Sequence, residues 1–343
     1  MIDPHVHCRD EEESYKGETI SNCLKHGFPI FDMPNTKKPV ITRQRALERI
    51  KLADSENYFL YMGLTANEKQ IEEAVSAHNE LSPKVIGLKM YACHSVGDLD
   101  VISEEEQKLV YKTLGRLNYY GVLSVHCEKE SLMRKELWSA SNPKSHSSAR
   151  PSGSEVASCT DQISFALSNN FKGHLHITHV SVPETAKLVY EAKGLMKISC
   201  GATPHHSLLG ALMDYENLNP VKSLYLKVNP PIRGKKESDE ILLMLKEGMI
   251  DFLESDHAPH SLDEKLNPPH LSGIPNLKFV RSYIKKFREK GFSEKRLEEI
   301  TSSKIKDVFN VQINDKPLKE IFGNDLDTAP RDDSKSFLFN PYE

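Results

Sequence analysis

The stretch VIGLKMYACHSVGDLDVISEEEQKLVYKTLGRLNYYGVLSVHCE, residues 85–128, holds two short apolar runs separated by an amphipathic segment. The runs 85–91 and 122–128 are bounded by polar clusters, which is typical of buried strands. Between them, Ser103 precedes Glu106 by three residues, the spacing of a capping box at a helix start. The stretch therefore predicts a strand, a helix and a second strand in that order.

The same order recurs along the chain. The other apolar runs are MIDPHVH (1–7), PIFDMPN (29–35), YFLYMGLTA (58–66), HLHITHVS (174–181), MKISCGATPHH (196–206) and IDFLESDHAPH (250–260). Helix-like segments lie at 41–54, 67–80, 104–118, 155–169, 183–193 and 237–248, and two more follow the last run at 276–291 and 293–309. Eight buried strands that alternate with helices predict an α/β fold, a (β/α)8 TIM barrel. A doubly wound parallel sheet is the alternative, but no GxGxxG turn follows any run.

A (β/α)8 barrel typically needs about 250 residues, and this chain has 343. We therefore predict a barrel over residues 1–310 and a C-terminal tail over 311–343 that packs on it. Inserted loops are expected at 129–154, which is rich in serine, and at 261–275, which is rich in proline.

The composition narrows the class of protein. With 38% hydrophobic residues, 27% charged residues and a net charge of -4, the chain resembles an ordinary globular protein. No basic run suggests a nucleic acid or a membrane surface as a partner, and no apolar stretch approaches the roughly 18 residues of a membrane span. The start also lacks the apolar core of a signal peptide, so we expect a cytoplasmic protein with a small-molecule substrate. A homodimer is compatible with this composition.

The cysteines are Cys8, Cys23, Cys93, Cys127, Cys159 and Cys200. Because no two of them show CxxC spacing, they are expected to be free thiols rather than zinc ligands.

Metal-type side chains gather at the ends of the apolar runs. They are His5, His7, Lys89, His126, His176, His179, His205, His206, Asp256, His257 and His260. A barrel brings the C-terminal ends of its strands together at one catalytic face, so these side chains should converge there. The predicted metal ligands are His5, His7, His126, His179 and Asp256. Four nitrogens and one carboxylate are enough to hold two ions, for which zinc is the best candidate, if a further group bridges them.

Lys89 is the unusual member of the set, because an ammonium group repels a metal ion. It becomes a bridging ligand only if its neutral amine takes up carbon dioxide to form a carbamate; the alternative is an ordinary salt-bridging lysine. Asp256 is the strand-end aspartate of the set, so the role of general base falls to it. Its alternative role is to bind metal without transferring a proton.

These motifs resemble those of a known group of enzymes. DPHVH, the strand-end lysine, VHCE, THVS and SDHAPH resemble the ligand set of the binuclear metal-dependent amidohydrolase superfamily. More narrowly, HVHCR, DMPNT, ARP, TPHH and KVNPPIR resemble the dihydroorotase family, in family order from residue 3 to about residue 275. The resemblance implies an amidohydrolase-type barrel, here without a complete N-terminal β-sandwich domain.

The resemblance also implies how the site is divided. His5 and His7 would hold the more buried ion, and His126 and His179 the other. Carboxylated Lys89 and a hydroxide would bridge the two ions, and Asp256 would complete the site. The implied reaction is the reversible hydrolysis and cyclisation between L-dihydroorotate and N-carbamoyl-L-aspartate in pyrimidine synthesis.

Substrate recognition has its own candidates. Arg9 lies two residues beyond His7, so strand alternation directs it to the same face, and its guanidinium suits bidentate carboxylate binding. By resemblance, Arg9, Asn35 and His260 hold the substrate's carboxylate. Asn229 lies near the family's ring-recognition loop, where its alternative role is to brace that loop.

The remaining expectations concern the surroundings of the site. His176 and His205 are expected to support the ligands or to pack, and Arg150 and Glu155 to form a structural pair near the entrance. The loop 93–100 resembles only loosely the mobile loop of some relatives, so a lid role for it is not predicted.

Two other functions stay open. An allantoinase or hydantoinase shares the metal set, but its substrate presents no comparable ring carboxylate for Arg9. A non-catalytic scaffold paralogue would be marked by lost metal ligands, and none is missing here.

Overall fold

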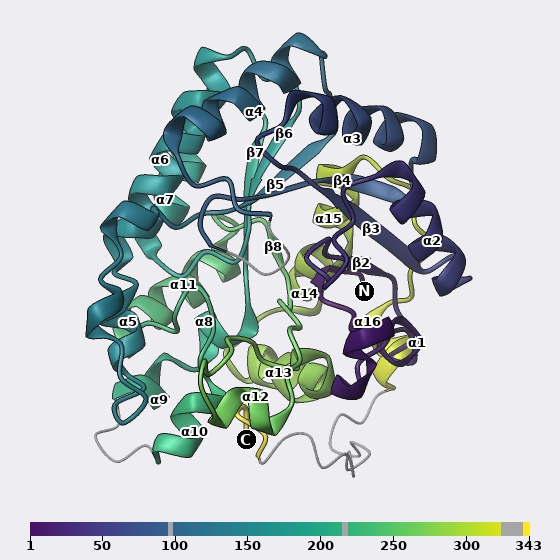
Figure 1. Ribbon diagram of the computed structural model, residues 1–343. Coiled ribbons are helices and arrows are strands. Elements are labelled where there is room, and N and C mark those ends of the chain that lie inside the picture. The colour runs from purple at the N-terminus through teal and green to yellow at the C-terminus, as the bar shows by residue number, and fades with distance from the viewer. Residues whose placement is uncertain (95–98, 215–218, 324–338) are drawn as a thin grey trace.

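The computed structural model describes residues 1–94, 99–214, 219–323 and 339–343. Eight parallel strands form its centre and helices surround them (Figure 1). The strands are β1 (Asp3–Val6), β2 (Ile30–Asp32), β3 (Tyr58–Gly63), β4 (Val85–Tyr91), β5 (Val122–His126), β6 (His174–Ile177), β7 (Ile198–Ala202) and β8 (Phe252–Leu253). Each strand pairs with the next one along the chain. The predicted (β/α)8 barrel is confirmed, and the doubly wound sheet is excluded.

The two ends of the sheet meet at a seam between β1 and β8. The pairing there is an isolated parallel bridge between Val6 and His257, and the backbone N–H of His7 donates to the carbonyl of His257 at 2.8 Å. His5 precedes this bridge in β1, and Asp256 precedes it in the segment that follows β8, so closing the barrel also brings these two side chains together.

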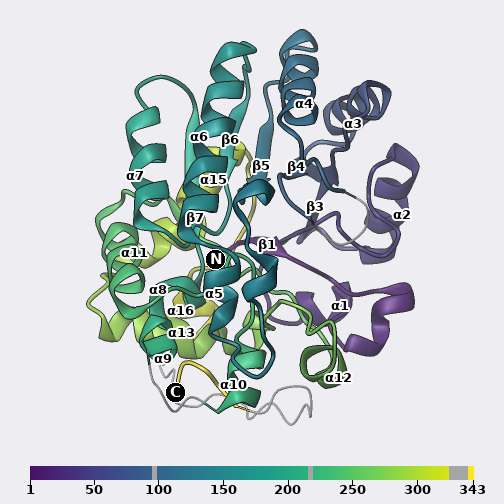
Figure 2. The same cartoon turned by 60° about the vertical axis from the view of Figure 1, so that its left-hand side comes forward.

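The helices match the predicted segments to within a few residues. The long outer helices are α2 (Arg43–Ala53), α3 (Glu68–Leu81), α4 (Glu104–Arg116), α6 (Ser152–Ser168), α7 (Pro183–Ala192), α11 (Lys235–Glu247) and α13 (Val280–Glu289). Ser103 and Glu106 form the predicted capping box of α4. Neighbouring helices α6, α7 and α11 lie side by side outside the barrel (Figure 2).

Shorter helices fill the connections. They are α1 (Ile20–Leu24), α5 (Ser145–Ala149), α8 (Pro204–Leu208), α9 (Gly210–Asp214), α10 (Pro220–Tyr225), α12 (Leu262–Leu266), α14 (Glu294–Glu298), α15 (Lys304–Phe309) and α16 (Leu318–Phe322). The segment predicted as one helix over 293–309 is interrupted by a π-helical turn at Glu299–Ser303. There the carbonyl of Thr301 accepts the backbone N–H of Ile2 at 2.6 Å, which ties the turn to the start of β1.

Aromatic side chains fill the N-terminal end of the barrel, opposite the predicted site. The ring of Phe309 lies 5.1 Å from that of Phe31, 6.0 Å from that of Tyr61 and 6.3 Å from that of Phe252. Val311 and Ile313 belong to the same buried cluster. The division into residues 1–310 and 311–343 stays a prediction, and residues 324–338 of that tail lie outside the described chain.

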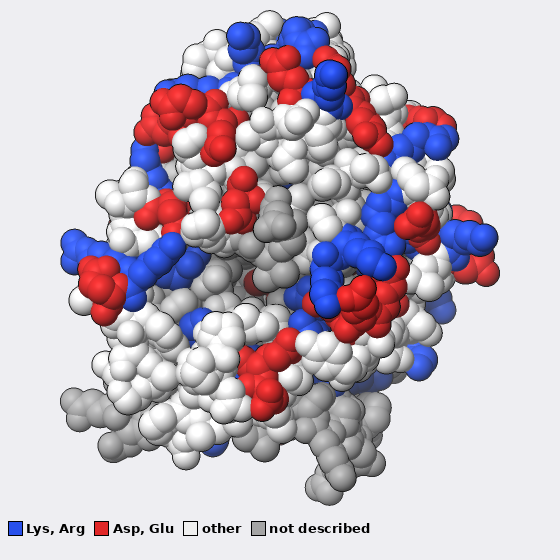
Figure 3. Space-filling model, in the orientation of Figure 1, with Lys and Arg blue, Asp and Glu red and all other residues white. Residues whose placement is uncertain are grey.

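The surface charge, the cysteines and the apolar character of the helices agree with the expectations from the sequence. Within the described ranges, none of the helices combines the length and apolar character needed to span a bilayer. The six cysteines are buried and free, as expected. Basic and acidic side chains are interspersed over the face shown in Figure 3.

Candidate active site

A cavity of about 290 Å³ opens at the C-terminal ends of the strands. Its walls include His5, His7, Arg9, Asn35, His126, His179, Asn229, Asp256 and His260. The barrel therefore brings together, in one cavity, nine of the ten side chains that the sequence proposed for metal and substrate, and Lys89 is the exception. A hollow is visible near the middle of this face (Figure 3).

The β1–β8 seam places two imidazoles on one carboxylate. Asp256 Oδ1 lies 3.4 Å from His5 Nε2 and 3.2 Å from His7 Nε2. Burial raises the pKa of Asp256, but the hydrogen bond with His7 and the neighbouring histidines outweigh this and hold it well below its usual range. The lowered pKa keeps the Asp256 carboxylate ionised where it lines the cavity.

The Nδ1 atoms of His5 and His7 also have polar partners. His5 Nδ1 lies 3.2 Å from Glu254 Oε2, and His7 Nδ1 lies 2.8 Å from Asn35 Oδ1. Since each Nδ1 faces an oxygen acceptor, the proton of the neutral ring belongs there and the Nε2 lone pair faces the cavity, as a metal ligand requires. Burial and the nearby Lys89 lower the pKa of His5 to about 4, so its ring is neutral near pH 7.

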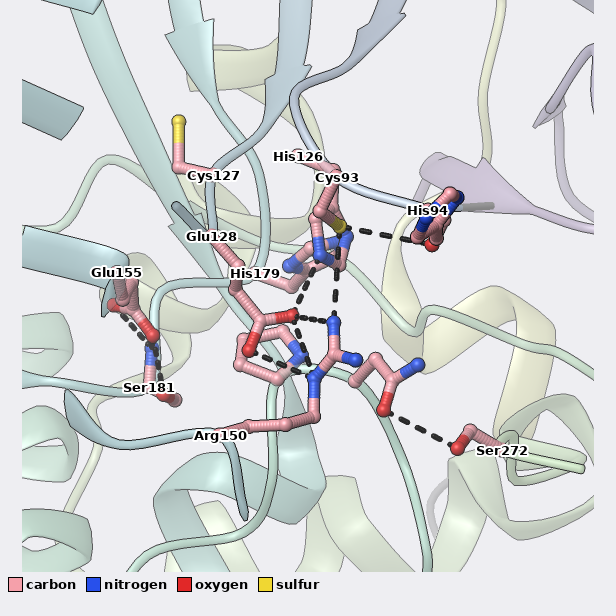
Figure 4. Close-up of polar contacts among 12 residues, drawn as sticks. Cys93, His94, His126, Cys127, Glu128, Arg150, Glu155, His179, Ser181 and Ser272 are labelled. Atoms are coloured by element: carbon pink, nitrogen blue, oxygen red, sulfur yellow. Dashed lines mark hydrogen bonds and ion pairs between the residues drawn. The ribbon is translucent and has the colours of Figure 1, made fainter. Parts of the chain in front are cut away.

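A second pair of imidazoles comes from β5 and the end of β6. His126 Nδ1 lies 3.2 Å from His179 Nε2, while His126 Nε2 lies 2.9 Å from Glu128 Oε2 (Figure 4). Burial lowers the pKa of His126, but Cys93 and Glu128 raise it to a net value of about 9. Because Glu128 can accept the proton of His126 Nε2, the lone pair of Nδ1 is free to face His179 Nε2, and a metal ion between these two nitrogens fits.

Two of the proposed ligands have a strained backbone. His179 has a φ of +39° and Asp256 a φ of +46°, a region that residues with a side chain rarely adopt. Such conformations persist where the surrounding structure fixes them, and they cluster at functional sites.

Lys89 lies beneath the cavity rather than in its wall. Its ammonium nitrogen is fully buried, 3.2 Å from the hydroxyl of Thr178 and 5.1 Å from the centre of the Tyr91 ring. No carboxylate of the described chain forms an ion pair with it. Burial lowers its pKa to about 8, although Glu254 and Asp256 oppose this. The lowered pKa increases the neutral fraction of the amine, the form that carboxylation requires.

The residues proposed to bind substrate differ in the hydrogen bonds that they already make within the protein. Arg9 is buried, lies 3.7 Å from Glu13 and has no hydrogen-bond partner for its Nε within the described chain. His260 Nε2 donates to the carbonyl of Ser272 at 3.0 Å. Asn229 Oδ1 accepts from the hydroxyl of Ser272 at 3.2 Å, so Asn229 does brace its loop while also lining the cavity.

One further group of metal-type side chains, Glu18, Cys23 and His257, is explained without an ion. His257 Nδ1 accepts the backbone N–H of Leu277 at 3.1 Å, which leaves the ring proton on Nε2, the atom that faces Glu18. The ammonium of Lys278 already lies 2.8 Å from Glu18. The ring proton of His257 and the ammonium of Lys278 therefore already face Glu18, where a metal ion would have to bind.

The predicted pairing of Arg150 with Glu155 is wrong. Arg150 Nε lies 3.0 and 3.1 Å from the two oxygens of Glu128, and its Nη2 also contacts Glu128 and, at 3.7 Å, the sulfur of Cys93 (Figure 4). Glu155 accepts instead from the backbone N–H of Ser181 at 3.0 Å and from its hydroxyl. The guanidinium of Arg150 thus occupies the position beside Cys93 and Glu128 where a metal ion could otherwise bind.

Glu128 and Glu254 are buried carboxylates that contact proposed ligands, and neither is among the site residues predicted from the sequence. Each lies two residues from a proposed ligand, Glu128 after His126 and Glu254 before Asp256. Strand alternation, which puts residues two apart on one face, is the signal that could have found them.

His176 and His205 do not line the cavity. His176 Nδ1 lies 3.0 Å from the hydroxyl of Ser199, and His205 Nδ1 accepts from the side-chain amide of Asn276 at 2.9 Å. Both rings are buried behind the site, where a packing or supporting role was expected.

Known proteins were compared with this chain. No family model matches it. The dihydroorotase of Methanosphaera stadtmanae is 28% identical over 340 residues, which cover 95% of this chain and 74% of that protein. The dihydroorotase of Pyrococcus abyssi is 33% identical over 283 residues, 81% of this chain and 59% of that protein. The chain spans about three fifths of the length of several other curated dihydroorotases that it matches.

Solved structures share the barrel. An L-hydantoinase (dihydropyrimidinase) from Arthrobacter aurescens matches with a TM-score of 0.75 and 22% identity, covering 90% of this chain and 70% of that one. A dihydroorotase from Saccharomyces cerevisiae, in complex with 5-fluoroorotic acid, matches with a TM-score of 0.69 and 19% identity, covering 91% and 84%. By sequence, the chain is a homologue of curated dihydroorotases, and by fold it shares its barrel with solved hydantoinase and dihydroorotase structures.

Proposed function

We propose that the protein is a dihydroorotase that interconverts L-dihydroorotate and N-carbamoyl-L-aspartate with two divalent metal ions, zinc in the native enzyme. One observation carries the proposal. Four imidazoles and the carboxylate of Asp256 converge in the cavity that also holds the buried guanidinium of Arg9. The dihydroorotase names of the curated relatives support it.

The donor set fits two ions. His5 and His7 would hold one, His126 and His179 the other, with Asp256 and a carbamate on Lys89 completing the centre. When bound, such ions polarise an amide carbonyl and lower the pKa of water from 15.7 to about 7.

Asp256 moves the proton in this proposal. Its ionised carboxylate takes a proton from the attacking water and gives it to the ring nitrogen as the amide bond breaks. In the cyclisation direction the same carboxylate accepts the proton of the attacking nitrogen.

Arg9, Asn35 and His260 position the substrate. All three line the cavity, and a guanidinium with an unpaired donor suits the ring carboxylate of dihydroorotate. The hydantoinase or allantoinase alternative leaves this donor without a partner, because those substrates present no comparable ring carboxylate.

The test is an assay of dihydroorotate, allantoin and dihydrouracil side by side, with elemental analysis of protein purified without chelator. We expect preferential turnover of dihydroorotate and close to two equivalents of divalent metal. Preference for allantoin or dihydrouracil would replace the proposed substrate. Bound metal without turnover of any of the three would favour a scaffold, and active protein with a metal content near zero would contradict the metal mechanism.

Lys89→Ala is expected to lose one or both ions and most of the activity, because the bridging carbamate is gone. A short carboxylic acid in the buffer should partly restore both by occupying the vacated position. Lys84→Ala, just before the other end of β4, is the matched control and should keep both ions. Metal content and turnover, measured together, check this. Full activity in Lys89→Ala would make the lysine merely structural.

A further inference from the structure

Glu254 lies directly after β8 and does not line the cavity, yet it contacts a proposed ligand of each ion. Its Oε2 lies 3.2 Å from His5 Nδ1, and its Oε1 accepts the backbone N–H of His179. His176 Nε2 lies 3.5 Å from the same Oε2. The side chain is 1% exposed. One buried carboxylate therefore joins β1 to the end of β6.

These contacts fix the position of the ring proton in His5 and the backbone conformation of His179. At His5, the carboxylate holds the ring proton on Nδ1 and so directs the Nε2 lone pair into the cavity. At His179, it holds a backbone whose φ of +39° is otherwise unfavourable. A buried ionised carboxylate is costly unless both oxygens find partners, and here both do.

The neighbouring strand makes room for this carboxylate. A Cβ at Gly201 in β7 would lie 2.5 Å from Glu254 Oε1 and 2.7 Å from its carboxyl carbon. Gly201 does not have a positive φ, so the need for glycine at this position comes from the carboxylate and not from the backbone conformation.

The negative charge of Glu254 also helps to balance the charge of the proposed metal centre. Two divalent ions would carry more positive charge than Asp256 and a carbamate on Lys89 together balance. Glu254 lies within contact of His5 and of the His179 backbone, so it lowers the excess by one unit without occupying a coordination position.

We propose that Glu254 is a positioning residue that ties the two halves of the metal centre together and raises their affinity for metal. The inference rests on the metal centre of the proposed function.

The experiment measures zinc affinity by competition with a chromophoric chelator, starting from metal-free protein. Loss of a group that orients a metal-bound histidine typically costs 10–100-fold in metal affinity. We expect Glu254→Gln to bind two zinc ions with affinities weakened by about that factor. At saturating zinc its KM should match the wild type, because Glu254 does not reach the cavity.

The matched control is Glu155→Gln, which removes another buried carboxylate that accepts a backbone N–H, from Ser181, outside the cavity. It should leave the zinc affinities unchanged. If Glu254→Gln does not fold, Gly201→Ala displaces the carboxylate without removing its charge and should weaken zinc binding in the same direction.

The outcomes separate this inference from the proposed function. Unchanged zinc affinity in Glu254→Gln, or in Gly201→Ala where that is the variant that folds, would overturn the positioning role. Loss of one whole ion at saturating zinc would also overturn it, because Glu254 would then be a ligand. If the wild type itself fails to bind two ions, the metal centre fails instead, whatever the variants do.

Discussion

Replacing Asp256 with asparagine is expected to lower kcat by a factor of about 10² to 10⁴, the usual cost of losing one general base. Asparagine keeps the shape and one oxygen that can face His5 and His7, so much of the metal should remain bound. The amide, however, cannot take a proton from water or return it to the ring nitrogen. Steady-state turnover of dihydroorotate and the metal content of the same sample together check this expectation.

Asp251→Asn is the control for that experiment. Asp251 lies five residues earlier, pairs with Lys193 at 2.8 Å and stays outside the cavity. Its variant should turn over substrate at close to the wild-type rate. Unchanged turnover in Asp256→Asn would move the proton shuttle to another group.

Arg9→Met is expected to weaken kcat/KM for dihydroorotate severely while leaving both ions in place. Removing one partner of a buried charged hydrogen-bond pair costs roughly 2–5 kcal/mol, which is about 30-fold to several thousand-fold at 1.4 kcal/mol per decade. Arg9→Lys should rescue poorly, because an ammonium group cannot reproduce the bidentate geometry of guanidinium. Kinetics on dihydroorotate and metal analysis of each variant provide the measurement.

Dihydrouracil, which lacks the carboxylate, supplies the internal comparison. It should be a poor substrate of the wild type and nearly indifferent to the loss of Arg9. Wild-type kcat/KM for dihydroorotate in Arg9→Met would refute the carboxylate assignment and favour the hydantoinase or allantoinase alternative.

The strand order of this barrel could be predicted because each strand is short, apolar and followed by a polar cluster. The same pattern located His5, His126 and Asp256, since parallel strands all end at one face. Periodicity also predicted helix 104–118, including the Ser103 cap. It did not predict the π-helical turn at Glu299–Ser303, where the carbonyl of Thr301 accepts a hydrogen bond from Ile2, nearly 300 residues away in the chain.

The partners of ion pairs were harder to predict than the positions of strands, helices and strand-end side chains. Arg150 and Glu155 lie close in sequence, but Arg150 extends to Glu128 on another element, and Glu155 turns to Ser181. Which carboxylate a guanidinium meets is decided by how loops fold over strand ends, and residue spacing carries no information about that. Glu254 is hard to separate from an ordinary strand residue by its sequence position alone, because the nearby Asp256 already supplies the carboxylate that the chemistry needs.

The β1–β8 seam has a consequence for the order in which the protein assembles. His7 and Asp256 lie 249 residues apart in the chain, and contacts of such separation require a large loss of chain entropy before they form. We therefore expect the proposed site of His5, His7 and Asp256 to form late in folding rather than as its nucleus. Once formed, each ion that binds only the folded barrel stabilises it in proportion to the logarithm of free metal concentration. We therefore expect the free energy of unfolding of the barrel to fall as free zinc is withdrawn.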